Sequence, residues 1–156
     1  MKYKNYTISD IKEMLTQQGI KPSIQRMKIL EYIVKNRNHP TVDMIYNAIK
    51  FEIPTLSKTT VYNTLKELVK KGILIELLID ENVIRYDMNI SPHVHFKCKI
   101  CGKIYDYDMN CEIFEKKEID GNRIEKYNVC LFGICKECLK KGDGRHGNKE
   151  DCRKCN

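Results

Sequence analysis

The first half of the chain repeats an apolar pattern with the period of an α-helix. Four stretches place apolar residues at three- and four-residue intervals, which gives each predicted helix one apolar face. Residues that typically begin or end helices flank these stretches. The four predicted helices lie between Thr7 or Ser9 and Gly19, Pro22 and Asn36, Thr41 and Pro54, and Ser57 and Gly72.

Two runs rich in β-branched residues follow the fourth helix. Ile73–Ile79 and Asn82–Met88 flank Asp80-Glu81, a pattern typical of a β-hairpin. Successive helices followed by a hairpin are the element order of a winged helix-turn-helix domain, in which the helix from Ser57 enters a DNA groove. We therefore predict such a domain over residues 1–88.

The pattern changes after residues 89–92, which we interpret as a hinge. The predicted elements that follow are strands over Val94–Cys98 and Lys103–Tyr107, a short helix near Cys111–Lys117, a strand over Arg123–Phe132 and a final short helix from Cys135. They form a small α/β domain over residues 93–141, so the predicted fold class is α+β. Residues 142–156 contain no aliphatic side chain, and we predict a disordered tail there.

Composition narrows the classes of protein without choosing one. The chain has 156 residues, 42% of them hydrophobic and 31% charged, as is ordinary for a protein that buries a core. It has no apolar run of membrane-spanning length, and its start lacks the apolar core of a signal peptide. We therefore expect a cytoplasmic protein with no membrane partner. Residues 1–90 carry 14 Lys/Arg and 10 Asp/Glu, a net +4, which is compatible with DNA binding but does not establish it.

Two Cys-x-x-Cys pairs predict a structural zinc site. Cys98 and Cys101 form the first pair, and Cys135 and Cys138 form the second. The two cysteines of a pair can wrap around one ion in a tight turn, and the two pairs together supply four ligands to a single zinc. Gly102 can adopt the positive φ that such a turn often needs. The alternative is a set of buried free thiols. No role is predicted for the other cysteines, Cys111, Cys130, Cys152 and Cys155.

A second donor set differs in chemistry. His93 and His95 are two residues apart on a predicted strand, so both imidazoles leave the same face, and Asp106 on the paired strand can reach it. Imidazole and carboxylate suit iron, manganese or zinc in an open site. Exposed strand histidines are the alternative. Taken alone, His39 is more often a structural residue, and Asp87 is more often a solvated one.

The fourth helix has a continuous polar stripe on its surface. Its hydroxyl, amide and lysine groups suit phosphates and base edges in a major groove, and an ordinary solvated face is the alternative. The predicted DNA contacts are Lys58, Thr59, Tyr62, Asn63 and Lys66, and Lys70 continues the stripe.

Several segments together resemble the ferric uptake regulator (Fur) family over roughly residues 7–140. They are Arg26, His39-Pro40-Thr41, Thr60–Leu65, Arg85-Tyr86-Asp87, His93–Cys98, Gly102–Asp106 and Gly133–Cys138. The resemblance implies a homodimeric repressor that binds palindromic operators in double-stranded DNA. Its second domain would be a dimerisation domain with a four-cysteine zinc site, one Zn2+ per subunit. A regulatory Fe2+ or Mn2+ would be held by His39, Asp87, His93, His95 and Asp106.

Finer features resemble the peroxide-sensing branch of this family. Asp87 and Asp106 stand where iron-uptake relatives often have glutamate, and Asn63 also matches that branch. This resemblance implies that peroxide oxidises His39 and His93. Tyr127-Asn128 replaces a histidine that many members carry for a further metal site, so we predict no third site.

Three other functions compete with this one. An iron- or zinc-uptake repressor would share the family, and a winged-helix module could use zinc only for folding. A zinc deaminase also combines histidine with Cys-x-x-Cys, but it needs His-x-Glu, and here His95 stands two residues after His93. We therefore expect neither an enzyme nor a small-molecule substrate.

Overall fold

The computed structural model describes residues 6–80, 82–109 and 111–142. The chain divides into two compact units, Met1–Ile90 and Ser91–Asn156, each described by itself below. Of the predicted tail, residues 143–156 lie outside the described residues. No helix in the part of the chain that the structure describes is long and apolar enough to cross a membrane.

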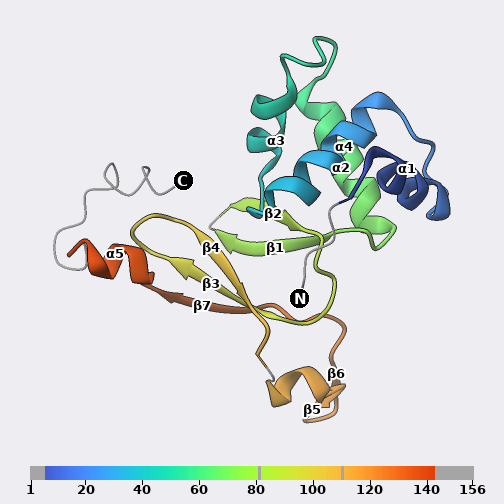
Figure 1. Ribbon diagram of the computed structural model, residues 1–156. Helices are drawn as coiled ribbons and strands as arrows, with labels where there is room; N and C mark the ends of the chain where they lie inside the picture. Colours follow the sequence, from blue (N-terminus) through green and yellow to red (C-terminus); the bar gives the residue numbers. More distant parts are fainter. Residues whose placement is uncertain (1–5, 81, 110, 143–156) are drawn as a thin grey trace. The chain divides into compact units, whose positions relative to one another are not determined.

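The first unit contains the four predicted helices (Figure 1). Each begins after a residue whose side-chain oxygen accepts a backbone N–H of the first turn, and the caps are Thr7, Ser23, Thr41 and Ser57. Asp10 completes a capping box with Thr7, so the first helix is capped by Thr7 rather than Ser9. The helices are α1 (Ile8–Gln17), α2 (Ile24–Asn36), α3 (Val42–Ile49) and α4 (Lys58–Lys70).

These helices bury their apolar faces in one core. Helix α2 packs against α1, α3 and α4, and α3 packs against α4. The hairpin of β1 (Ile75–Asp80) and β2 (Val83–Asp87) is antiparallel and contributes Tyr86, whose side chain is buried in the same core. The Tyr86 N–H donates to the Pro40 carbonyl (3.0 Å), and the Arg85 Nη1 donates to the His39 carbonyl (3.1 Å). The hairpin is therefore anchored to the turn before α3, as in the predicted winged helix-turn-helix.

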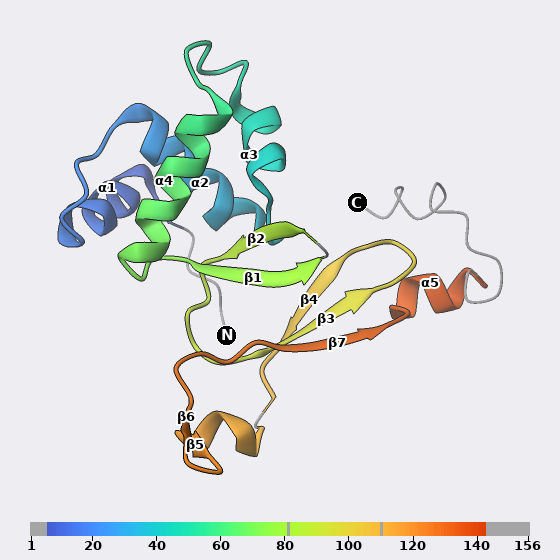
Figure 2. The same cartoon turned by 180° about the vertical axis from the view of Figure 1, so that it is seen from behind.

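The second unit is built on a three-stranded mixed sheet (Figure 2). Strand β3 (Val94–Cys98) lies in the centre, antiparallel to β4 (Ile104–Tyr107) and parallel to β7 (Val129–Gly133). A 3-10 turn over Glu112–Glu115 follows β4, and the short helix α5 (Lys136–Lys140) follows β7. The helices of the first unit and the mixed sheet of the second give the α+β class that the sequence predicted.

One predicted strand was wrong in its extent. In place of one strand over Arg123–Phe132, the chain forms a small hairpin of β5 (Glu118–Ile119) and β6 (Asn122–Arg123), and β7 begins only at Val129. Asp120 and Gly121 both have positive φ (49° and 79°), which is the two-residue turn that an Asp-Gly pair favours. The turn pairs the start of the predicted run with β5, and residues 124–128, which form no regular strand, separate β6 from β7.

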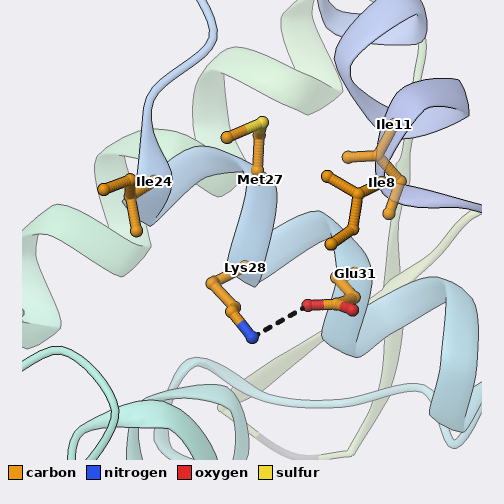
Figure 3. A pocket seen from close by; sticks show the side chains of 6 residues that line it. All are labelled: Ile8, Ile11, Ile24, Met27, Lys28 and Glu31. Carbon is orange, nitrogen blue, oxygen red and sulfur yellow. Dashed lines mark ion pairs between the residues drawn. The ribbon is translucent and has the colours of Figure 1, made fainter.

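A small apolar pocket lies between α1 and α2 (Figure 3). Ile8, Ile11, Ile24 and Met27 line it, and Lys28 and Glu31 add charged groups to the lining. The Lys28 Nζ lies 3.2 Å from Glu31 Oε2 and 2.8 Å from Glu52 Oε2. The apolar lining marks the seam between two packed helices rather than a place for polar chemistry.

The cap of α4 gives a test of this architecture. Ser57 Oγ accepts the Thr60 N–H at 3.0 Å, and we expect Ser57→Ala to lower the free energy of unfolding by about 1 kcal/mol. Ser57→Thr, which keeps the hydroxyl acceptor, should stay close to wild type. Urea unfolding followed by circular dichroism measures both, and equal stability of the Ala and Thr variants would contradict the cap.

Candidate metal centres

Four cysteine thiols converge in the second unit. Cys98 ends β3, Cys101 lies in the turn that follows, Cys135 directly precedes α5, and Cys138 lies within it. Their sulfur atoms all lie within 4.8 Å of one another. Gly102 closes the turn after Cys101 with a φ of +73°, the left-handed conformation expected from the sequence.

The spacing of the sulfurs matches a tetrahedral ion. Cys98 Sγ lies 3.8 Å from Cys138 Sγ, and Cys101 Sγ lies 3.8 Å from Cys135 Sγ. A tetrahedron with Zn–S bonds of about 2.3 Å has sulfurs about 3.8 Å apart, whereas a disulfide needs about 2.05 Å. None of the four forms a disulfide in the part of the chain that the structure describes. The residues therefore fit Zn2+ in a closed site.

Hydrogen bonding prepares the first thiol of this group to bind a cation. Burial raises the pKa of Cys98, but hydrogen bonds from the backbone N–H groups of Cys101, Cys135 and Ile100 lower it by more, to about 6. The N–H of Cys135, for example, donates to Cys98 Sγ at 3.3 Å. Burial and contacts with the neighbouring sulfurs raise the pKa of Cys101 to about 12. Metal binding would shift all four toward thiolates, because the bound ligand is the deprotonated sulfur.

The imidazole and carboxylate donors of the second unit also lie together. His95 is paired in register with Asp106 on the neighbouring strand, and His93 immediately precedes β3. Asp106 Oδ1 lies 3.6 Å from His93 Nε2 and 3.7 Å from His95 Nε2. The two imidazole rings are 4.2 Å apart between centroids. These three donors face one point, as the parity of the strand predicted.

A backbone carbonyl orients one of these imidazoles. His93 Nδ1 lies 2.8 Å from the Ser91 carbonyl oxygen, which can accept a hydrogen bond only from a protonated Nδ1. That tautomer leaves Nε2, the atom beside Asp106, with its lone pair available to a metal. No sequence pattern pointed to this contact, because the carbonyl belongs to no side-chain motif.

In the first unit, His39 and Asp87 lie side by side. His39 Nε2 lies 3.6 Å from Asp87 Oδ2, and the Asn89 N–H donates to Asp87 Oδ1 at 2.9 Å. Asp87 is only 8% exposed, which does not fit its interpretation as a solvated residue. His39 has a φ of 47°, an uncommon backbone conformation outside glycine that concentrates at functional sites.

The polar stripe of α4 lies on its exposed face. Thr59, Tyr62, Asn63, Lys66 and Lys70 are all exposed, while the opposite face of the helix is buried in the core. Tyr62 is 46% exposed despite its large ring. Lys58, in the first turn of α4, is ion-paired with Asp43 on α3, a residue to which no sequence pattern pointed.

The remaining cysteines lie outside the thiol group as far as the structure describes them. Cys130 on β7 donates its S–H to Asn128 Oδ1 (3.2 Å), and Cys111 lies just before the 3-10 turn. Cys152 and Cys155 lie outside the described residues. Tyr127 packs its ring against Phe114 and donates to the Lys116 carbonyl.

Comparison with known proteins identifies the family. The model of the Ferric uptake regulator family matches residues 17–131. The chain belongs to the Fur family. The peroxide operon regulator of Bacillus subtilis is 33% identical to it over 139 residues, which cover 87% of this chain and 96% of that protein. The peroxide-responsive repressor PerR of Staphylococcus aureus is 34% identical over 131 residues, which cover 81% and 88%.

Solved structures of Fur proteins share the fold. The Helicobacter pylori ferric uptake regulator aligns with a TM-score of 0.66 over 86% of this chain and 95% of that chain, at 23% identity, which concerns the fold alone. The Francisella tularensis ferric uptake regulator, solved with iron, aligns with a TM-score of 0.64 at 27% identity over 78% and 96%. The predicted family and fold class are confirmed, and these relatives are regulators rather than enzymes.

In this Fur-family chain, Cys98→Ser should abolish zinc binding. We expect the bound zinc to fall from one ion per chain to none, because a tetrahedral site does not tolerate loss of one thiolate. Structural zinc contributes on the order of 10 kcal/mol to folding, so the second unit should unfold as well. Elemental analysis and circular dichroism measure the two effects.

Cys111→Ser is the matched control. It removes one half-buried thiol from the same unit but leaves the four-sulfur group intact, so it should keep its zinc and its fold. A folded, zinc-free Cys98→Ser protein would contradict the structural-zinc assignment.

Proposed function

We propose that this Fur-family chain is a metal-dependent transcriptional repressor that senses peroxide and binds palindromic operators as a homodimer. This proposal rests on two groups of imidazole and carboxylate donors, one before and one after residues 89–92 in the sequence. His39 and Asp87 lie before that segment, and His93, His95 and Asp106 lie after it. The peroxide-related names of the Bacillus and Staphylococcus relatives support the choice of signal.

One ion bound by all five residues would act on the hinge. Three nitrogens and two carboxylates suit Fe(II) or Mn(II), whereas the four thiols suit Zn(II). Because the five ligands come from both units, metal binding would fix the angle between them. In a dimer that angle sets the spacing of the two α4 helices, so the DNA-binding form depends on the metal. We place this activity in the cytoplasm.

The proposed response to peroxide is oxidation of histidines that bind the regulatory metal. Fe(II) held by these five residues would supply the electron that starts the reduction of peroxide, and overall one peroxide would transfer one oxygen to one imidazole and leave as water. His39 and His93 are the proposed targets, and each gains one oxygen. An oxidised imidazole binds metal poorly, so the hinge is released and the operator is freed. The zinc thiolates are the rival target, but their saturated coordination makes them slower to react.

The exposed edge strand of the sheet in the second unit favours a homodimer. Strand β7 lies at the edge of the sheet, and it exposes Leu131 (46%) and Phe132 (54%). An exposed edge with large apolar side chains is an unstable surface for an isolated chain. A second copy pairing along β7 would cover it and would present two α4 helices to the two halves of a palindrome.

The DNA-reading face of α4 can be tested with two substitutions. Tyr62→Ala should relax recognition at one base step, at a cost of about 1–3 kcal/mol. Lys66→Ala should weaken binding evenly across sequences and flatten its salt dependence, because a lysine contacts phosphate. The measurement is fluorescence anisotropy on a duplex selected in vitro from a random library. Unchanged binding in both variants would move the interface away from α4.

The peroxide proposal is tested by mass spectrometry after mild peroxide treatment of the Fe(II) and Mn(II) forms. We expect a gain of one oxygen on the peptides containing His39 and His93 in the iron form only, together with loss of DNA binding. The manganese form should bind DNA and resist oxidation, and so serves as the control. Loss of DNA binding with intact histidines would point to cysteine oxidation. Full retention of binding would favour an iron- or zinc-uptake repressor.

A further inference from the structure

The first residue of α4 is held by a carboxylate of α3. The Lys58 Nζ lies 2.6 Å from Asp43 Oδ1 and 5.8 Å from the centre of the Tyr46 ring. Asp43 and Tyr46 are three residues apart on α3, so they form one side of a helix against which the lysine lies. Both charged side chains are largely exposed, 59% for Lys58 and 65% for Asp43.

This ion pair contributes little to the stability of the fold. Exposed lysine–carboxylate pairs contribute little to folding, because water and salt screen them. A lysine in the first turn of a helix is also unfavourable, since the positive end of the helix dipole lies there. That same position suits a contact with DNA phosphate, because the lysine and the backbone N–H groups at the start of the helix both attract anions.

We infer that Asp43 competes with DNA phosphate for Lys58 and thereby lowers the affinity of the chain for DNA. This inference rests on the proposed function, in which α4 is the DNA-reading helix. To reach a phosphate, Lys58 must leave Asp43, and the exposed carboxylate then has to recruit a cation from solution. Part of the gain from releasing a phosphate counterion is lost in this exchange. Asp43 therefore acts through Lys58 and does not itself contact DNA.

The consequence is a limit on sequence-independent binding. Phosphate contacts carry no base information, so attenuation at Lys58 weakens random and operator DNA alike. When phosphate contacts contribute less to the free energy of DNA binding, a repressor depends more on the correct spacing of its two α4 helices. The metal-free form, which lacks that spacing in our proposal, is then less able to remain on DNA.

The test is Asp43→Asn in the full-length chain loaded with zinc and Mn(II). The substitution keeps the size of the side chain and the Thr41 cap of α3. We expect roughly three- to tenfold tighter binding to a short duplex of random sequence at low salt, and a slope of log K against log[KCl] that is steeper by up to about 0.9. The same variant should tighten operator binding by a similar factor.

Glu52→Gln is the matched control for net charge. It also removes one negative charge and one exposed carboxylate–lysine pair, but its partner is Lys28 on α2, beside the apolar pocket (Figure 3). Its affinity for random DNA and its salt slope should stay close to those of wild type. An equal gain in Glu52→Gln and Asp43→Asn would overturn the inference in favour of a general charge effect.

A double variant distinguishes failure of the Asp43 inference from failure of the proposed α4 interface. Lys58→Ala should weaken DNA binding, and adding Asp43→Asn to it should then change little, because the competitor has nothing left to release. If Lys58→Ala weakens binding but Asp43→Asn alone changes neither affinity nor slope, the inference fails and the proposed interface stands. If Lys58→Ala, Tyr62→Ala and Lys66→Ala all bind DNA as wild type does, the proposed interface fails and the inference fails with it.

Discussion

The second unit depends on four thiols that bring distant parts of the chain to one point. Its core consists of Cys98, Cys135 and Cys138, with partly buried apolar residues packed around them. Three cysteines thus take the place that aliphatic side chains hold in a larger domain. A unit of this size buries too little apolar surface to fold securely without such a link. The metal at this site is therefore part of the fold rather than an addition to it.

Strand β3 serves two metal chemistries because its side chains alternate between two faces. Cys98 points to one face and takes part in the closed thiol group, while His95 points to the other and lies beside Asp106. Fixing the end of the strand through Cys98 also limits where His95 can lie. The closed site thereby supports the geometry of the open one, although the two groups have different ligands.

The sequence alone determined the features that depend on neighbouring residues and on the periodicity of apolar and polar positions. The caps at Thr41 and Ser57, the turn at Gly102, the spacing within each Cys-x-x-Cys pair and the shared face of His93 and His95 all follow from residues close together in the chain. The period of α4 also separated its buried face from its polar stripe, because each face recurs every three or four residues. The metal-ligand and DNA-contact assignments remain predictions.

Other features required the tertiary structure, because their partners are distant in sequence or are backbone atoms. The Asp43–Lys58 pair joins two helices, and the Ser91 carbonyl that orients His93 has no side-chain signature. The Asp120-Gly121 turn was visible in the sequence, but the extended run after it formed the stronger pattern. There the two-residue turn, with positive φ at both positions, pairs Asn122–Arg123 with β5 instead of with β7, and residues 124–128 form no strand.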